Sequence, residues 1–172
     1  LEGAWPEFMY HDAVLNRLFG RVIDELPEFQ YYAWDDEREE VVGVGNGIPA
    51  VWDGEIASLP DGGVDAVVEA GFAEGAPTPT VLCALQILIA PDYRGQGLSS
   101  RMIERMGEIG RQHGPDLELS GDGAPDQPVH LRDQQVDIDR LRIQRLLAGK
   151  GEQPAGQLGA ALGRLARHFG QR

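Results

Sequence analysis

The sequence is poor in cysteine and in metal-binding patterns. Cys83 is the single cysteine among 172 residues, so the chain cannot build an internal disulfide framework or a cysteine-based metal site. Because Cys83 sits in an apolar run, we expect a core residue, with a nucleophile as the alternative. The histidines at 11, 113, 130 and 168 lack metal-ligand spacing. We therefore expect no metal cofactor.

Long hydrophobic runs are also missing. No apolar stretch approaches the roughly 18 residues that a membrane-spanning helix requires. No signal-peptide pattern is visible from Leu1 onward, although the chain does not start with methionine. We expect a cytoplasmic protein that has no membrane partner.

Positive charge is scarce. The chain has 15 Lys and Arg against 28 Asp and Glu, a formal net charge of −13. This balance argues against nonspecific nucleic-acid binding, which needs clustered cations, and slightly favours a cationic small-molecule partner. Acidic residues dominate 1–130, whereas basic residues prevail in 131–172. We interpret the basic end as a solvated helical face.

The remaining features are those of one globular domain in which helices and strands alternate. Apolar spacing predicts amphipathic or core-facing helices at 12–26, 59–75 and 98–112. Strands are predicted at 29–34, 41–52, 81–90 and 117–120, the first two forming a hairpin around a charged turn at 35–40. Glycines at 43, 45 and 47 either weaken their strand or mark a close approach to its backbone. The fold class is α/β (α+β), with a mixed central sheet and helices on both faces.

The last third differs from the rest. Residues 121–135 are polar and rich in proline and glycine, and apolar spacing predicts helices at 136–149 and 155–170. We therefore divide the chain into a ligand-binding domain, 1–120, and an atypical C-terminal segment, 121–172, packed on the same domain. The sheet would then have an incomplete edge, which favours a homodimer.

One stretch, IAPDYRGQGLSSRMIERM, joins a strand to a helix through a glycine-bearing turn. The first turn of a helix has unpaired N–H groups and a partial positive charge, and glycine lets an anion approach them. Arg94 adds forked donors that suit phosphate. The turn is either a phosphate site or only a tight connection. RGQGLSS has no Walker lysine, and Ser100 replaces the third glycine of a Rossmann fingerprint.

The same stretch resembles the acyl-CoA signature of the GCN5-related N-acetyltransferase superfamily, Arg/Gln-x-x-Gly-x-Gly/Ala after a strand that ends in x-Pro-x-Tyr. Here the signature starts at Arg94 and departs at its last position, where Ser99 replaces Gly or Ala. The stretches WPEFMYHDAVLNRLFGRVIDELPEFQ, GNGIPAVWDG and LPDGGVDAVVEAG are also similar to an uncharacterised bacterial branch. The resemblance covers roughly residues 5–114.

The resemblance implies a cofactor, acetyl-CoA or another acyl-CoA, and an amine as acceptor. The turn would hold the pyrophosphate, and the strand before it would splay from its neighbour to bind pantetheine and polarise the thioester. The cofactor-binding residues implied are Gln86, Ile87, Leu88, Ile89, Arg94, Gly95, Gln96, Gly97, Ser99 and Ser100. Arg101 and Arg105 could reach the 3′-phosphate or form a solvated face.

The catalytic residues stay unassigned. The family often uses a tyrosine beyond the second splayed strand, but the tyrosines here are at 10, 31, 32 and 93. Glu28, Asp53 and His113 are candidate bases by elimination only, and Trp52 either packs or contacts the acceptor. The function implied is an N-acyltransferase, most simply acetyl transfer by direct attack of the amine. The alternatives are a non-catalytic acyl-CoA-binding module and a structural or interaction domain.

Overall fold

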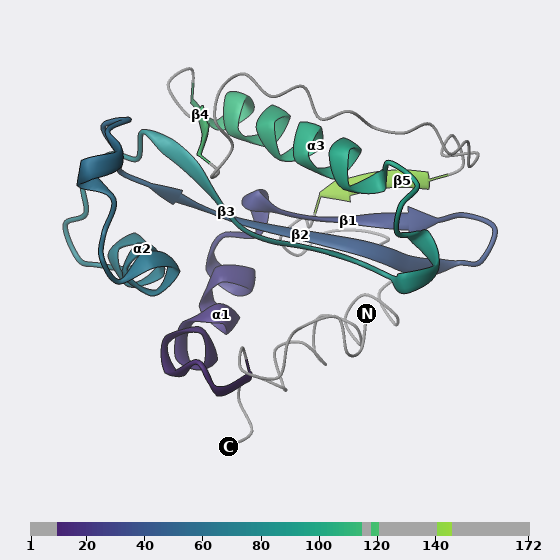
Figure 1. Ribbon diagram of the computed structural model, residues 1–172, viewed down its shortest axis with the longest axis horizontal. Helices are drawn as coiled ribbons and strands as arrows, with labels where there is room; N and C mark the ends of the chain where they lie inside the picture. The colour runs from purple at the N-terminus through teal and green to yellow at the C-terminus, as the bar shows by residue number, and fades with distance from the viewer. Residues whose placement is uncertain (1–9, 115–117, 121–140, 146–172) are drawn as a thin grey trace.

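The computed structural model describes residues 10–114, 118–120 and 141–145, which form a mixed five-stranded sheet with helices on both faces. The strand order is β4-β3-β2-β1-β5. Helix α3 covers one face, and helices α1 and α2 lie on the other (Figure 1). The predicted α/β class is therefore confirmed. The strands and helices are β1 (Gln30–Asp35), β2 (Glu40–Ala50), β3 (Val81–Ile89), β4 (Glu118–Ser120), β5 (Leu141–Arg145), α1 (Ala13–Glu25), α2 (Gly63–Gly71) and α3 (Leu98–His113).

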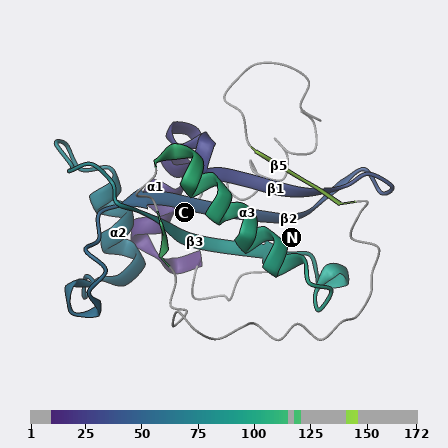
Figure 2. The same cartoon turned by 90° about the horizontal axis from the view of Figure 1, so that it is seen from above.

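The centre of the sheet is a three-strand meander. Strand β2 pairs antiparallel with β1 on one side and with β3 on the other, which confirms the predicted hairpin. Strand β4 then pairs parallel with the beginning of β3. The chain makes that parallel connection through α3, which lies over β3 and β2 (Figure 2). A β-α-β connection of this kind places the N-terminus of the helix at the carboxyl end of the first strand.

The face under α3 holds the larger of the core clusters. Spacing predicts a core-facing stripe that also includes Ile103. The helix buries the other members, Leu98, Met102, Met106 and Ile109, whereas Ile103 is exposed. The hydroxyl of Tyr31, on β1, donates a 2.6 Å hydrogen bond to the backbone oxygen of Met102. This bond gives a buried tyrosine hydroxyl the partner that it needs inside an apolar cluster.

The glycines of β2 are explained by these same side chains. A Cβ on Gly45 would lie 2.2 Å from Cζ of Tyr31, and one on Gly43 would lie 2.8 Å from the sulfur of Met102. Leu82 similarly approaches Gly47. Of the two interpretations of these glycines, close approach to the backbone is therefore confirmed.

The opposite face is covered by α1 and α2. Helix α1 begins after Asp12, whose Oδ1 accepts hydrogen bonds from the N–H groups of Val14 and Leu15, as expected of an N-cap. Apolar residues of α1 pack with Val68 of α2 and Ile48 of β2. The short helix predicted within 59–75, with a cap near Asp61 or Asp65, is found as α2. Its N-cap is Gly62, next to Asp61, and no side chain caps it.

One predicted helix is wrong. Residues 136–149 were expected to be helical, but Leu141–Arg145 form strand β5, which pairs antiparallel with β1. Strand β5 lies after residue 120, where the sequence predicts a domain boundary. The boundary itself stays a prediction. The predicted helix 155–170 lies outside the described residues. Within the described ranges, no helix is long and apolar enough to cross a membrane.

Candidate functional site

The strand-turn-helix unit predicted from the sequence is present. Strand β3 ends at Ile89, the 3₁₀ turn Pro91–Tyr93 follows, and α3 begins at Leu98. The N–H groups of Tyr93 and Arg94 close this turn on the backbone oxygens of Ala90 and Pro91, at 2.9 and 3.2 Å. The N-terminus of α3 is thereby held at the carboxyl end of β3. In α/β folds, this is a common position for a bound anion.

Two glycines allow the chain to enter the helix at this sharp angle. Gly95 has φ +72° and Gly97, the N-cap, has φ +78°, both in the left-handed region that side chains disfavour. No side chain caps the helix, and its first turn has no acidic residue. A Cβ on Gly95 would meet nothing within 4 Å. The N-terminus of α3 therefore has no side-chain cap among the residues that the structure describes, and the turn beside it is sterically open.

Arg94 and Gln96 shape the turn from its exposed side. The Nε of Arg94 donates a 3.1 Å hydrogen bond to the backbone oxygen of Ile89, and the amide of Gln96 donates at 2.7 Å to that of Asp92. Arg94 is exposed and forms no ion pair with any residue that the structure describes. Its terminal guanidinium nitrogens are thus available to an anion beside the helix N-terminus.

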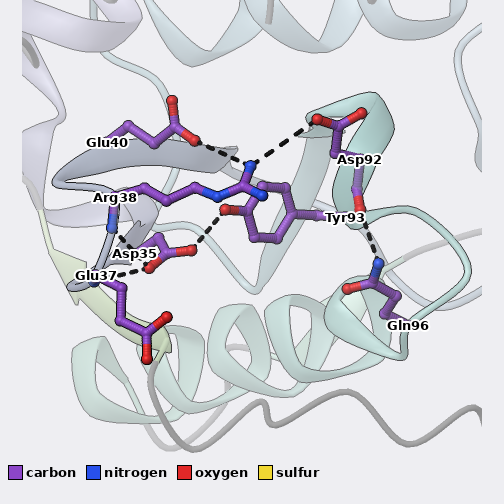
Figure 3. A network of polar contacts seen from close by, with 7 residues as sticks. All are labelled: Asp35, Glu37, Arg38, Glu40, Asp92, Tyr93 and Gln96. Atoms are coloured by element: carbon purple, nitrogen blue, oxygen red, sulfur yellow. Dashed lines mark hydrogen bonds and ion pairs between the residues drawn. The ribbon is translucent and has the colours of Figure 1, made fainter.

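A polar network ties the turn to the β1–β2 hairpin (Figure 3). The buried hydroxyl of Tyr93 donates a 2.5 Å hydrogen bond to Oδ2 of the buried Asp35. Oδ1 of Asp35 accepts from the N–H groups of Glu37 and Arg38, at 2.9 and 3.2 Å. The guanidinium of Arg38 lies 5.5 Å from the Tyr93 ring centroid and 3.9 Å from the carboxylate of Asp92. Side chains of the β1–β2 hairpin, which are distant from the turn in sequence, therefore hold the turn in position.

Burial, followed by the hydrogen bond to Asp35, raises the pKa of Tyr93 to about 12. Tyr93 therefore stays protonated at neutral pH and donates a hydrogen bond to Asp35, so its hydroxyl is not a free general acid. From the sequence, Tyr93 was only part of the strand-end pattern, and Asp35 belonged to a charged turn. Their separation of 58 residues explains why no local pattern revealed the pair.

Strand β3 changes its pairing close to this turn. It bulges at Leu85, because Asn46 of β2 pairs with Gln86 while the adjacent Gly47 pairs with Ala84. On its other edge, β4 pairs only with Val81–Cys83, and no described strand lies beside 84–89 there. Bulges of this kind occur near active sites, where they reorient backbone and side-chain groups.

The arginines of α3 are not equivalent. Arg105 forms an ion pair with Glu108, one turn along the helix, at 2.7 Å. Arg101 is half-buried and closer to the helix start. The serines that follow the turn, Ser99 and Ser100, lie in the first turn of α3, with Ser99 exposed. The ion pair favours the surface-face interpretation for Arg105.

The candidate bases are not placed together. Asp53 lies in an exposed loop, where Ser58 and the N–H of Glu55 donate hydrogen bonds to it and lower its pKa. His113 is at the far end of α3, with its ring 4.8 Å from Phe29. Glu28 lies in the 3₁₀ turn before β1. Asp53 and His113 thus have local structural contacts.

Trp52 and Cys83, a possible acceptor contact and a possible nucleophile, also have structural contacts. The indole Nε1 of Trp52 donates to the backbone oxygen of Glu55 at 3.0 Å. Cys83 is half-buried and packs against the cluster beneath α1 and α2. Packing is thus the interpretation that the structure favours for Cys83, while the indole of Trp52 is held by a local hydrogen bond in an exposed loop.

Comparison with known proteins gives one informative relative. The chain is 27% identical, over 123 residues, to the arginine N-acetyltransferase avaD of Aspergillus versicolor. The match covers 65% of this chain and 41% of that protein, so the chain spans about two fifths of the relative's length. No protein-family model matches the chain. No solved structure matches it either. The similarity points to acetyltransferases as the class of relatives.

Proposed function

We propose that this chain binds acetyl-CoA, or another acyl-CoA, and transfers the acyl group to an amine. The observation that carries the proposal is the uncapped N-terminus of α3, which two positive-φ glycines present at the end of β3 beside exposed Arg94. The helix end offers N–H donors and about half a positive charge, and the guanidinium adds a full charge. A pyrophosphate matches this combination of oriented donors and positive charge.

The rest of the cofactor would follow β3. The residues Gln86–Ile89 lie after the bulge, along an edge that no described strand occupies. Backbone groups on such an edge can pair with the amides of a pantetheine arm, as they would with another strand. A backbone N–H near the thioester would stabilise the oxyanion that forms on its carbonyl oxygen.

The chemistry that this arrangement supports is direct aminolysis. The lone pair of a neutral amine forms a C–N bond with the thioester carbon, and the C–S bond breaks with its electron pair on sulfur. The amine loses one proton to water, and the thiolate takes one from water. The similarity to an arginine N-acetyltransferase and the net charge of −13 both favour a cationic amino acid as acceptor.

The cofactor is tested first. Isothermal titration of the chain with acetyl-CoA should show binding, and Arg94→Glu should weaken it by about tenfold or more, the scale of one charge-assisted hydrogen bond replaced by repulsion. Arg111→Glu, at the exposed far end of the same helix, makes the same charge change and should leave binding intact. Equal affinities for both variants and the parent would refute the pyrophosphate assignment.

Turnover is tested separately. Release of free thiol from acetyl-CoA should depend on an added amine, and a panel containing L-arginine, L-lysine and neutral amines should show which acceptors react. The second candidate function is acyl-CoA binding without transfer, which is favoured because β3 carries neither a carboxylate nor a histidine. Tight acetyl-CoA binding with no amine-dependent thiol release would favour that second function.

A further inference from the structure

Three amide side chains form a buried hydrogen-bonded row across the sheet. Nδ2 of Asn46, on β2, donates to Oε1 of Gln30, on β1, at 3.0 Å. Nε2 of Gln86, on β3, donates to Oδ1 of Asn46 at 2.5 Å. Gln30 and Asn46 are almost completely buried. The row therefore links the start of β1 to the bulged part of β3 through side chains alone.

The direction of the row is fixed at its first member. Nε2 of Gln30 donates to two backbone oxygens, those of Leu26 and Gly47, at 2.8 and 3.0 Å. Because that end of the amide must be the donor, Oε1 of Gln30 must accept from Asn46, and Oδ1 of Asn46 must accept from Gln86. The acceptor at the end of the row is Oε1 of Gln86.

This oxygen is buried and has no hydrogen-bond partner among the described residues. A buried acceptor without a donor is costly, and such groups in native proteins usually have a ligand or water as partner. Gln86 is the first residue of the stretch expected to lie along the cofactor, directly after the bulge at Leu85. The row thus ends in an unsatisfied acceptor at the site.

The side chain of Gln86 lies on the face of the sheet away from α3. Asn46 lies between Val44 and Ile48 on β2, whose side chains pack on the face away from α3. Ile87 and Ile89 instead pack with the cluster under α3, the helix that would hold the pyrophosphate. Oε1 of Gln86 therefore belongs to the face opposite the phosphate-binding helix, so the pyrophosphate is not its partner.

We propose, on the basis of the function proposed above, that Oε1 of Gln86 accepts a hydrogen bond from an N–H of the acceptor amine. That bond would orient the remaining lone pair of the nitrogen toward the thioester carbon. An amide oxygen binds an N–H but does not take its proton, so Gln86 binds the acceptor and is not a general base. A carboxylate in its place would stabilise the ammonium form, which has no lone pair for attack.

Gln86→Met tests this, since it nearly keeps the shape while it removes the oxygen, together with the amide group that donates to Asn46. With acetyl-CoA saturating and the fastest amine of the panel varied, we expect kcat/KM for the amine to fall about tenfold, the scale of one hydrogen bond. The acetyl-CoA dissociation constant from calorimetry should stay close to that of the parent, because Gln86 would contact the pantetheine arm through its backbone alone. Intact binding also shows that the variant is folded. Gln96→Met makes the same substitution in the cofactor turn and should instead weaken acetyl-CoA binding.

Gln86→Glu supplies a readout that a purely structural role would not change. The carboxylate should favour the ammonium form of the bound amine, so the pH profile of kcat/KM should shift to higher pH. An unshifted profile would overturn the proposal. So would a Gln86→Met variant whose kinetics match the parent, because water would then be the partner, or one whose defect is in acetyl-CoA binding alone.

Failure of this inference is distinguishable from failure of the proposed function. If the parent binds acetyl-CoA but turns over no amine of the panel, the acceptor role of Gln86 is refuted while the cofactor site stands. If acetyl-CoA does not bind at all, the pyrophosphate site itself is refuted, and the acceptor role falls with it.

Discussion

Replacing Tyr93 by phenylalanine removes one hydroxyl and keeps the ring beneath the turn. The hydroxyl donates to Oδ2 of Asp35, and the side chains of both residues are buried. Oδ1 of Asp35 keeps its two backbone donors in the variant, from Glu37 and Arg38. Oδ2 loses its 2.5 Å bond from the Tyr93 hydroxyl, which is a hydrogen bond to a buried carboxylate.

The expected cost follows from that geometry. A hydrogen bond to a charged group contributes about 1.5–3 kcal/mol, against about 0.5–1.5 kcal/mol for a neutral pair. Tyr93→Phe should therefore lower the free energy of unfolding by about 2 kcal/mol, measured by urea denaturation at neutral pH. Because the same bond holds the turn on the hairpin, acetyl-CoA should also bind more weakly.

The chain provides a matched control in Tyr31→Phe. Tyr31 is equally buried, but its hydroxyl donates to the backbone oxygen of Met102. That oxygen is in the middle of α3 and remains within reach of the helical N–H one turn on. We expect a loss of about 1 kcal/mol for Tyr31→Phe. Equal losses in the two variants would refute the charged-partner argument.

The same pair makes a prediction for alkaline pH. Burial and the bond to Asp35 raise the pKa of Tyr93 to about 12, above the value of about 10 for an unfolded tyrosine. The stabilisation from Tyr93 is therefore complete below pH of about 10 and is lost as the pH rises toward about 12. Burial also raises the pKa of Tyr31, so both proteins lose stability in that range. As the pH rises through this range, the parent should lose more unfolding free energy than Tyr93→Phe. Parallel curves of unfolding free energy against pH for the two proteins would contradict the assignment of the raised pKa to Tyr93.

Three further substitutions test separate parts of the fold and the site. Gly95→Ala should weaken acetyl-CoA binding and destabilise the turn by about 1 kcal/mol, since φ is +72° while the space around it is open. Gly45→Ala should lower the thermal midpoint far more, because its Cβ would overlap the ring of Tyr31. Asp12→Ala should cost about 1 kcal/mol in urea denaturation by removing the N-cap of α1.

The parts of the fold that the sequence predicted well are those with local rules. The buried run at 81–90, the glycine turn and the amphipathic stretch after it have the periodicities of a strand and a helix, and each was found. The hairpin was similarly marked by two strand patterns around a charged turn. These elements depend on residues that are neighbours in sequence, so spacing alone identifies them.

Strand β5 shows where such rules fail. In LRIQRLL, the apolar residues at 141, 143, 146 and 147 fit helical spacing, although the first two also fit strand alternation. The pairing of this segment with the edge of β1, more than 100 residues earlier, determines its conformation. A short segment with both patterns takes the structure that its tertiary partner requires.

The binding sites for the two substrates of the proposed reaction differ in the same way, one being local in sequence and the other formed by distant residues. The pyrophosphate site consists of consecutive residues from Arg94 onward, so its glycines and arginine form a readable motif. The proposed acceptor contact depends instead on Gln30, Asn46 and Gln86, whose successive hydrogen bonds span 16 and 40 residues. Amides so far apart have no sequence signature, and none of them is ionisable. A search for carboxylates and histidines therefore passes over the group that the structure leaves unsatisfied. The acceptor side of such a site has to be found by following each buried donor to its acceptor.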